Sequence, residues 1–370
     1  PHQLERSYES LPRYRSFAVA GRNCGMGKRT FAVVGAYCTG DIFGTALCGN
    51  CGTAKEVSMH RIQAKNILSA TNGINLYRGC THGCIYCDSR SACYQMEHDF
   101  EDVAVKENAP QLLEEALRRK RRLCMIGTGA MSDPYLHCEE QLGLTRQCLE
   151  LIAKYGFGAT VLTKSDRVLR DLDLLQKIQQ NAKCVVQMTL TTWNETLCRI
   201  LEPHVCTTRR RYEVLKIMQA NGIPTVVWLT PILPFLNDTE QNLRGILEYC
   251  FDVGVKGICC FGMGVTLREG DREFFYAQLD KHFSGMKEQY MRRFGNAYEC
   301  PSPNQARLMT IFRESCAKYD VMYEPNQIFA YLREFPECHL ANFPSEPVSY
   351  LPARILRAYF PRYFGKILEN

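Results

Sequence analysis

The sequence predicts an α/β fold built as a partial barrel of six parallel strands. From residue 74 onward, short apolar runs alternate with longer amphipathic runs, at the roughly 25–45-residue spacing that strand–helix–strand units need. Such units place their strands parallel and their crossovers right-handed. Glycine turns return the chain from helix to strand at residues 155–158, 221–223 and 253–257. Periodicity leaves a doubly wound sheet open as the alternative.

Six runs are predicted to be strands because they are short, apolar and bounded by turn residues. They span residues 74–78, 123–128, 159–163, 184–190, 225–230 and 257–261. Runs of helical period lie at residues 111–119, 141–155, 168–180, 209–220 and 240–252. In either fold the chemistry belongs at the carboxyl ends of the strands, where polar residues follow one strand after another.

Composition divides the chain into three parts. Residues 1–58 are rich in glycine and cysteine with weak periodicity, and we expect a poorly ordered extension there. Residues 59–265 hold the predicted barrel. Residues 266–370 carry charged helical patterns at 272–294 and 303–318 and then a proline- and aromatic-rich tail from Pro336. We therefore expect a C-terminal helical extension flanking the barrel.

Twenty cysteines in 370 residues are unusual for a chain of ordinary globular composition. A long chain rich in helical patterns needs no disulfide scaffold, and no apolar run is long enough for a signal peptide or a membrane span. We therefore expect a cytoplasmic protein whose cysteines are mostly buried as small apolar side chains, as at Cys124, Cys148, Cys184 and Cys259.

Charge gives a weaker indication of the partner. The net charge of +6 is compatible with an anionic partner but is far from that of a dedicated nucleic-acid binder. Two short basic runs, at residues 118–122 and 209–211, are interpreted as solvated helix faces, with nucleic-acid contact as the alternative.

The strongest chemical signal is the C-x3-C-x2-C arrangement of Cys80, Cys84 and Cys87 directly after the first predicted strand. Three thiolates at this spacing can bind three irons of a [4Fe–4S] cluster and leave the fourth iron open. An open iron can bind the amino and carboxylate groups of S-adenosylmethionine (SAM). Electron transfer then breaks the S–C5′ bond and releases a 5′-deoxyadenosyl radical.

Zinc is the alternative for this loop, with His82 as a fourth ligand, although structural zinc usually uses two separated ligand pairs. A second metal site is a further hypothesis for the N-terminal extension. Its cysteines contain one C-x2-C pair and otherwise loose spacing, at Cys24, Cys38, Cys48 and Cys51.

With Tyr86 before its last cysteine, the loop resembles the radical SAM superfamily. Residues 75–94 resemble the branch related to spore photoproduct lyase. The resemblance covers residues 59–335, with further anchors at residues 127–135, 189–192, 201–203 and 228–234. It implies a partial (β/α)6 TIM barrel of radical SAM type, a [4Fe–4S] cluster and SAM as cofactor.

The resemblance also implies cofactor contacts. Ser132 follows the second predicted strand and resembles a serine at the SAM site, and Lys164 follows the third and resembles the lysine that pairs with the methionine carboxylate. Thr189 or Thr191 stands where a hydroxyl contacts SAM. Tyr86 belongs to the same cofactor-binding set.

The family suggests a nucleic-acid lesion as substrate and flavodoxin or ferredoxin as electron donor. A peptide or small metabolite is the enzyme alternative, and an iron–sulfur electron carrier or sensor is the non-enzyme alternative. Two departures argue against inheriting photoproduct repair, because Ala130 replaces a hydrogen-donor cysteine and Asp88 replaces a tyrosine. Cys93 and Tyr94, near the loop, are candidate hydrogen donors.

Overall fold

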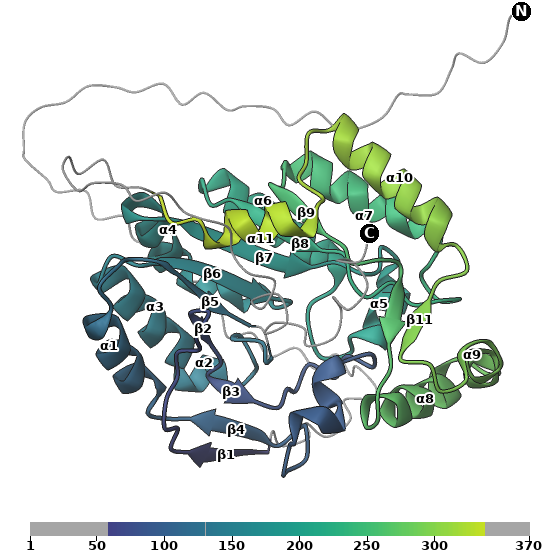
Figure 1. Ribbon diagram of the computed structural model, residues 1–370, viewed down its shortest axis with the longest axis horizontal. Coiled ribbons are helices and arrows are strands. Elements are labelled where there is room, and N and C mark those ends of the chain that lie inside the picture. Colours follow the sequence, from purple (N-terminus) through teal and green to yellow (C-terminus); the bar gives the residue numbers. More distant parts are fainter. Residues whose placement is uncertain (1–57, 130, 337–370) are drawn as a thin grey trace, which may run out of the picture. The chain divides into compact units, whose positions relative to one another are not determined.

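The computed structural model describes residues 58–129 and 131–336. Its main sheet has six parallel strands, each paired with the next along the chain (Figure 1). They are β2 (Gly73–Ile74), β5 (Met125–Thr128), β6 (Gly158–Thr163), β7 (Cys184–Thr189), β8 (Thr225–Trp228) and β9 (Gly257–Cys259). The order never reverses, as it would at the switch point of a doubly wound sheet. The prediction of an α/β partial barrel is confirmed, and within the described residues β9 and β2 are unpaired with each other.

Helices connect successive strands, as the periodicity predicts. They are α1 (Ala109–Arg119), α2 (Glu139–Leu142), α3 (Leu144–Lys154), α4 (Leu172–Asn181), α5 (Glu195–Leu201), α6 (Thr208–Ala220) and α7 (Glu240–Val253), with short 3-10 turns η1 (Asp88–Arg90), η2 (Ala92–Tyr94) and η3 (Asp166–Asp171). The single helix predicted over 141–155 is wrong in one respect. Gly143 takes a left-handed φ of 60° and ends α2 before α3 begins.

Alternate residues of each barrel strand face two different cores. Val186 belongs to the large core that also includes Leu175 of α4, on the helix-covered side. Val185, its neighbour, packs in a smaller core with Ile328 of α11 (Pro325–Arg333). Helix α11, which the sequence analysis did not predict, therefore packs against the inner face of the strands.

The run predicted as one strand over 74–78 is two strands in different sheets. Only β2 belongs to the barrel. Strand β3 (Tyr77–Arg78) pairs antiparallel with β4 (Val103–Lys106), which pairs parallel with β1 (Met59–Ile62). The chain thus leaves the barrel at residues 75–76, and β3 leads directly into the cysteine loop.

The C-terminal part also differs from prediction in one helix. The run 272–294 forms α8 (Asp271–His282) and α9 (Met286–Phe294), because Gly285 has a left-handed φ of 75° between them. Helix α10 (Gln305–Lys318) follows as expected. Strand β10 (Gly264–Thr266), which spans the boundary expected after residue 265, pairs with β11 (Glu299–Pro301).

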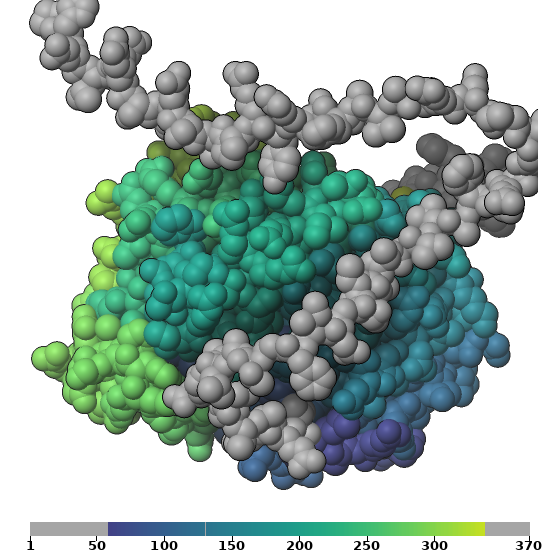
Figure 2. All heavy atoms as spheres, turned by 180° about the vertical axis from the view of Figure 1, so that it is seen from behind, coloured from purple at the N-terminus to yellow at the C-terminus, as the bar shows by residue number. Residues whose placement is uncertain are grey.

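The small sheet and the C-terminal helices can both be seen at the surface of the described residues. In Figure 2 the purple and blue residues of the small sheet lie at the lower edge, and the bright green residues of α8 and α9 lie at the left. In the part of the chain that the structure describes, no helix is long and apolar enough to cross a membrane. The predicted N-terminal cysteine site, Ala130 and the tail beyond Pro336 lie outside the described residues.

The cysteine burial predicted from sequence largely holds. Cys148, Cys184 and Cys259 are buried, whereas Cys124 is only half-buried. The cysteines in the described residues form no disulfide bonds.

Candidate active site

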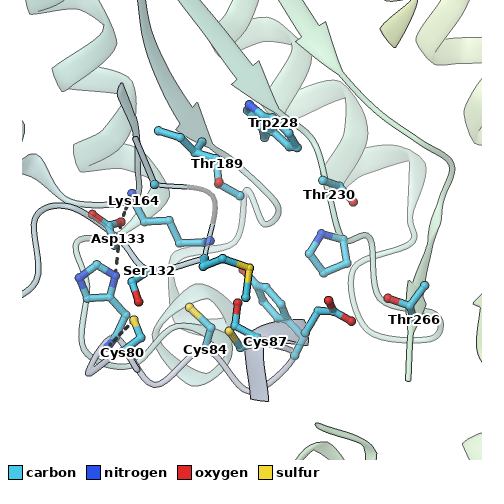
Figure 3. Close-up of a pocket in the computed structure, with 18 of the residues that line it drawn as sticks. Cys80, Cys84, Cys87, Ser132, Asp133, Lys164, Thr189, Trp228, Thr230 and Thr266 are labelled. Carbon is cyan, nitrogen blue, oxygen red and sulfur yellow. Dashed lines mark hydrogen bonds and ion pairs between the residues drawn. The ribbon is translucent and has the colours of Figure 1, made fainter. Parts of the chain in front are cut away.

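A cavity of about 230 Å³ opens at the carboxyl ends of the barrel strands. Most of the residues predicted for the site line it: Cys80, Cys84, Tyr86, Cys87, Ser132, Lys164 and Thr189. Figure 3 shows the three cysteines on one loop along one side, with Lys164 reaching toward them from the end of β6. Residues separated by more than 100 positions therefore share one site.

The cysteine loop is shaped by two glycines with positive φ. Gly79 has φ 92°, and a Cβ there would lie 2.6 Å from the backbone oxygen of Phe100. That same oxygen accepts a 2.9 Å hydrogen bond from the amide of Cys80. Gly83 has φ 69°, and a Cβ there would lie 2.8 Å from the ring of His204. Any side chain at either position is thus disfavoured by both conformation and space.

The spacing of the ligand atoms discriminates between zinc and a cluster. A tetrahedral zinc with bonds of about 2.3 Å holds its thiolates roughly 3.8 Å apart. Among the described residues, the only three potential ligand side chains with atoms within 4.8 Å of one another are His60, His98 and Asp102. No three of the loop cysteines and His82 thus have their ligand atoms all within 4.8 Å of one another, so this arrangement does not surround one zinc ion. A cluster does not need such close approach, since each of its irons takes a different sulfur.

His82 is directed to a carboxylate instead. Its Nδ1 lies 3.6 Å from Asp133 Oδ2, and burial lowers the pKa of His82 to about 4. Asp133 also accepts hydrogen bonds from Thr163 Oγ1 at 2.7 Å and from the amide of Lys164 at 2.8 Å. The hydroxyl of Ser132 donates to the carbonyl of Gly79 at 2.6 Å. The Ser-Asp pair after β5 thus fastens the cysteine loop to the end of β6.

A fully buried ion pair lies behind the loop. Arg211 Nη1 is 2.6 Å from Glu202 Oε2, and neither side chain is exposed. The other oxygen of Glu202 accepts a hydrogen bond from the hydroxyl of Tyr86. Arg211 also donates to the carbonyls of Lys164 and Thr189, each at 3.1 Å. One guanidinium therefore links the ends of β6 and β7 to the residue before the last loop cysteine.

This ion pair corrects one interpretation made from the sequence. The basic run 209–211 was expected to be a solvated helix face, but Arg211 is 0% exposed. Its helix turns it inward because Glu202 supplies the opposite charge. Burial opposes ionisation of Glu202, yet the charges of Arg211 and Lys164 hold the pKa of that carboxyl below its ordinary value.

Lys164 presents a charged group to the cavity. Burial alone would lower the pKa of Lys164, but the Cys84 thiol and Glu202 raise it, so the ammonium form is retained. In the described part of the chain, no hydrogen bond or ion pair occupies its ammonium group. A cation without a protein partner, beside buried thiols, is suited to an anionic ligand group.

Three predicted site residues lie off the cavity. Thr191 is fully buried, with its Oγ1 3.4 Å from Thr192 Oγ1, so of the two threonines Thr189 is the one at the cavity. Cys93 is exposed and receives a 3.1 Å contact from Arg268 Nη1. The hydroxyl of Tyr94 donates to Asp88 Oδ2 at 2.7 Å.

The opposite wall was found only in part from the sequence. Its residues come from β8 and β10, from their flanks and from the residue before β11: Trp228, Thr230, Phe261, Thr266, Arg268 and Tyr298. Trp228 and Thr230 lie in the stretch 228–234 that carries the family resemblance, whereas the other four were not predicted for the site. Arg268 Nη2 donates to the hydroxyl of Tyr298 at 2.6 Å, and its Nε lies 3.6 Å from Asp88 Oδ1. These four residues carry no motif spacing, because only the folded chain brings the C-terminal part beside the loop.

Comparison with known proteins identifies a family for this chain. The sequence model of the Radical SAM superfamily matches residues 74–250. An uncharacterized protein of Methanocaldococcus jannaschii is 33% identical over 193 residues, covering 50% of this chain and 71% of that protein. An uncharacterized protein of Mycobacterium tuberculosis is 28% identical over 254 residues, covering 66% of this chain and 74% of that protein.

Among solved structures, a spore photoproduct lyase mutant superposes with a TM-score of 0.54 at 12% identity, covering 72% of this chain and 81% of that one. Another, with bound AdoMet and dinucleoside spore photoproduct, gives 0.50 at 15% identity and covers 68% and 75%. The fold is thus shared with spore photoproduct lyase. The chain belongs to the radical SAM superfamily, whose members are enzymes.

The buried pair generates the first prediction. Glu202→Ala should lower the free energy of unfolding by about 3–5 kcal/mol, because Arg211 would remain buried without its counter-charge. Urea denaturation measures the change. The matched control is Glu115→Ala, which removes an exposed pair with Arg119 and should cost less than about 1 kcal/mol. Equal effects of the two variants would contradict the role assigned to Glu202.

Proposed function

We propose that this chain binds a [4Fe–4S] cluster through Cys80, Cys84 and Cys87 and cleaves SAM reductively. The observation that carries the proposal is the single cavity lined by these three thiols and by the charged Lys164. When bound and reduced, the cluster supplies an electron that cleaves SAM to methionine and a 5′-deoxyadenosyl radical, which abstracts a hydrogen atom from the substrate.

The protein's own residues hold and orient these groups. Lys164 would pair with the methionine carboxylate of SAM, since its ammonium group is buried, charged and directed into the cavity. Thr189 and Ser132 line the same cavity and offer hydroxyl oxygens, although the proton of Ser132 is already donated to Gly79. Leu162, Trp228 and Phe261 would exclude water from a reactive radical.

The proposed substrate class is a nucleic-acid lesion. A solved spore photoproduct lyase contains a dinucleoside photoproduct, which supports a nucleic-acid lesion as the class. A peptide or small metabolite is the alternative. Thymine photoproduct repair itself is not proposed, because Ala130 and Asp88 depart from the repair enzymes. A flavodoxin or ferredoxin would supply the electron.

The central test of catalysis uses Cys84→Ala after anaerobic reconstitution with iron and sulfide. Wild-type protein with dithionite and SAM should release 5′-deoxyadenosine, measured by chromatography, whereas the variant should lose cluster iron and the product together. Cys124→Ala is the control, because that half-buried thiol lies off the cavity. A cluster-loaded wild-type protein that releases no 5′-deoxyadenosine would leave only an electron carrier or sensor.

Lys164→Met tests the carboxylate contact separately from the cluster. Hydrogen bonds to charged groups contribute about 1.5–3 kcal/mol, so the KM for SAM should rise about tenfold to a hundredfold. Iron content should stay unchanged. Lys177→Met, on the exposed face of α4, should alter neither quantity. An unchanged KM in Lys164→Met would remove this lysine from the SAM site.

A further inference from the structure

A second cavity lies inside the barrel, next to the cysteine cavity. Its volume is about 110 Å³, and it shares Leu162 and Trp228 with the first. Phe329 and Leu332 of α11 close its other side. The two cavities are therefore neighbours that share two lining side chains.

The walls of this inner cavity, which we call the lumen pocket, carry buried polar groups with unused hydrogen-bonding capacity. Thr128, Thr160 and Gln187 line it and are 8%, 7% and 5% exposed. The hydroxyl of Thr128 is buried without any hydrogen-bond partner among the described residues. Thr160 adds a second hydroxyl to the same wall. An interior built only for packing would not leave a hydroxyl such as that of Thr128 unpaired.

Gln187 orients its amide toward the same space. Its Oε1 accepts a 2.9 Å hydrogen bond from Trp228 Nε1, so its Nε2 group is the part left to donate. The pocket thus combines one amide donor with two hydroxyls that can donate or accept. This set matches a carboxamide, which presents a carbonyl oxygen beside an N–H group.

The charge and the size of the lumen pocket further restrict the chemical class of the ligand that it can bind. Of the described residues that line the lumen pocket, Arg333 is the one ionisable side chain, so a cationic ligand group would meet a like charge and no compensating carboxylate. The volume is smaller than the roughly 150 Å³ of an apolar cavity that binds benzene. A small amide group fits these limits better than an aromatic ring does.

We propose that the lumen pocket is a binding subsite for an uncharged carboxamide group. Resting on the proposed function, we further assign it the substrate end that lies farthest from the cysteines. A substrate anchored there would pass between Leu162 and Trp228 and expose its next atoms to the cavity where the radical forms.

The test uses 2,2,2-trifluoroacetamide as probe and ¹⁹F NMR line broadening on the full chain. Trifluoroacetate, which has the same shape but no N–H to donate to the threonine hydroxyls, is the matched probe and should bind more weakly. Thr128→Val removes the unpaired hydroxyl at nearly constant volume. Gly127→Ala adds a methyl group 3.3 Å from Thr160 Oγ1. Each variant should weaken trifluoroacetamide binding at least fivefold, whereas Thr310→Val, on the exposed face of α10, should not.

Equal binding of the two probes, no binding of trifluoroacetamide, or undiminished binding in the folded variants would overturn the subsite. If Thr128→Val fails to fold, Thr160→Val and Gly127→Ala carry the same comparison. SAM cleavage without substrate is measured in parallel and should persist in Gly127→Ala. Amide binding by a protein that never cleaves SAM would support the subsite while overturning the proposed function and the anchoring role that rests on it.

Discussion

The ion pair between Glu202 and Arg211 is the constraint on which the site depends. Both side chains are fully buried, and their atoms approach to 2.6 Å. Because an uncompensated charge is so costly in the interior, the two groups cannot separate without a large loss of stability. The pair therefore fixes the distance between the loop, through Tyr86, and the ends of β6 and β7. The cavity exists where it does because these parts are tied to one centre.

The same arrangement explains how thiols and a lysine can share a dry pocket. Burial raises the pKa of Cys84 to about 12, so this thiol alone would stay protonated at neutral pH. A bound metal centre displaces such protons, since coordination deprotonates a thiol outright. Lys164 lowers the cost of thiolate charge further, through its favourable interaction with Cys84 and Cys87. The positive lysine and the cysteines are thus electrostatically complementary.

Most of the barrel could be predicted from sequence, because its strands alternate with helices at regular intervals. The cysteine loop could be predicted too, because all three thiols lie within eight consecutive residues. The division between β2 and β3 could not, since apolar residues continue through both and only pairing with β4 separates them. Arg211 was misjudged for a similar reason. A helical arginine in a basic run resembles a surface residue until the buried carboxylate beside it is known.

The opposite wall and the lumen pocket show what periodicity cannot supply. Arg268 and Tyr298 come from separate elements of the C-terminal part and meet only through folding. Thr128 appears in the sequence as an ordinary strand residue, and only the structure shows that its buried hydroxyl has no hydrogen-bond partner among the described residues. A buried polar group without a partner can be recognised only when every possible hydrogen-bond partner around it is known.

A cluster held by the three loop thiolates would leave one iron open to SAM. Electron paramagnetic resonance of the reconstituted, dithionite-reduced protein measures this directly. We expect a reduced [4Fe–4S] signal whose g values shift when SAM is added. A cluster signal that SAM leaves unchanged, from protein with full iron loading, would contradict it.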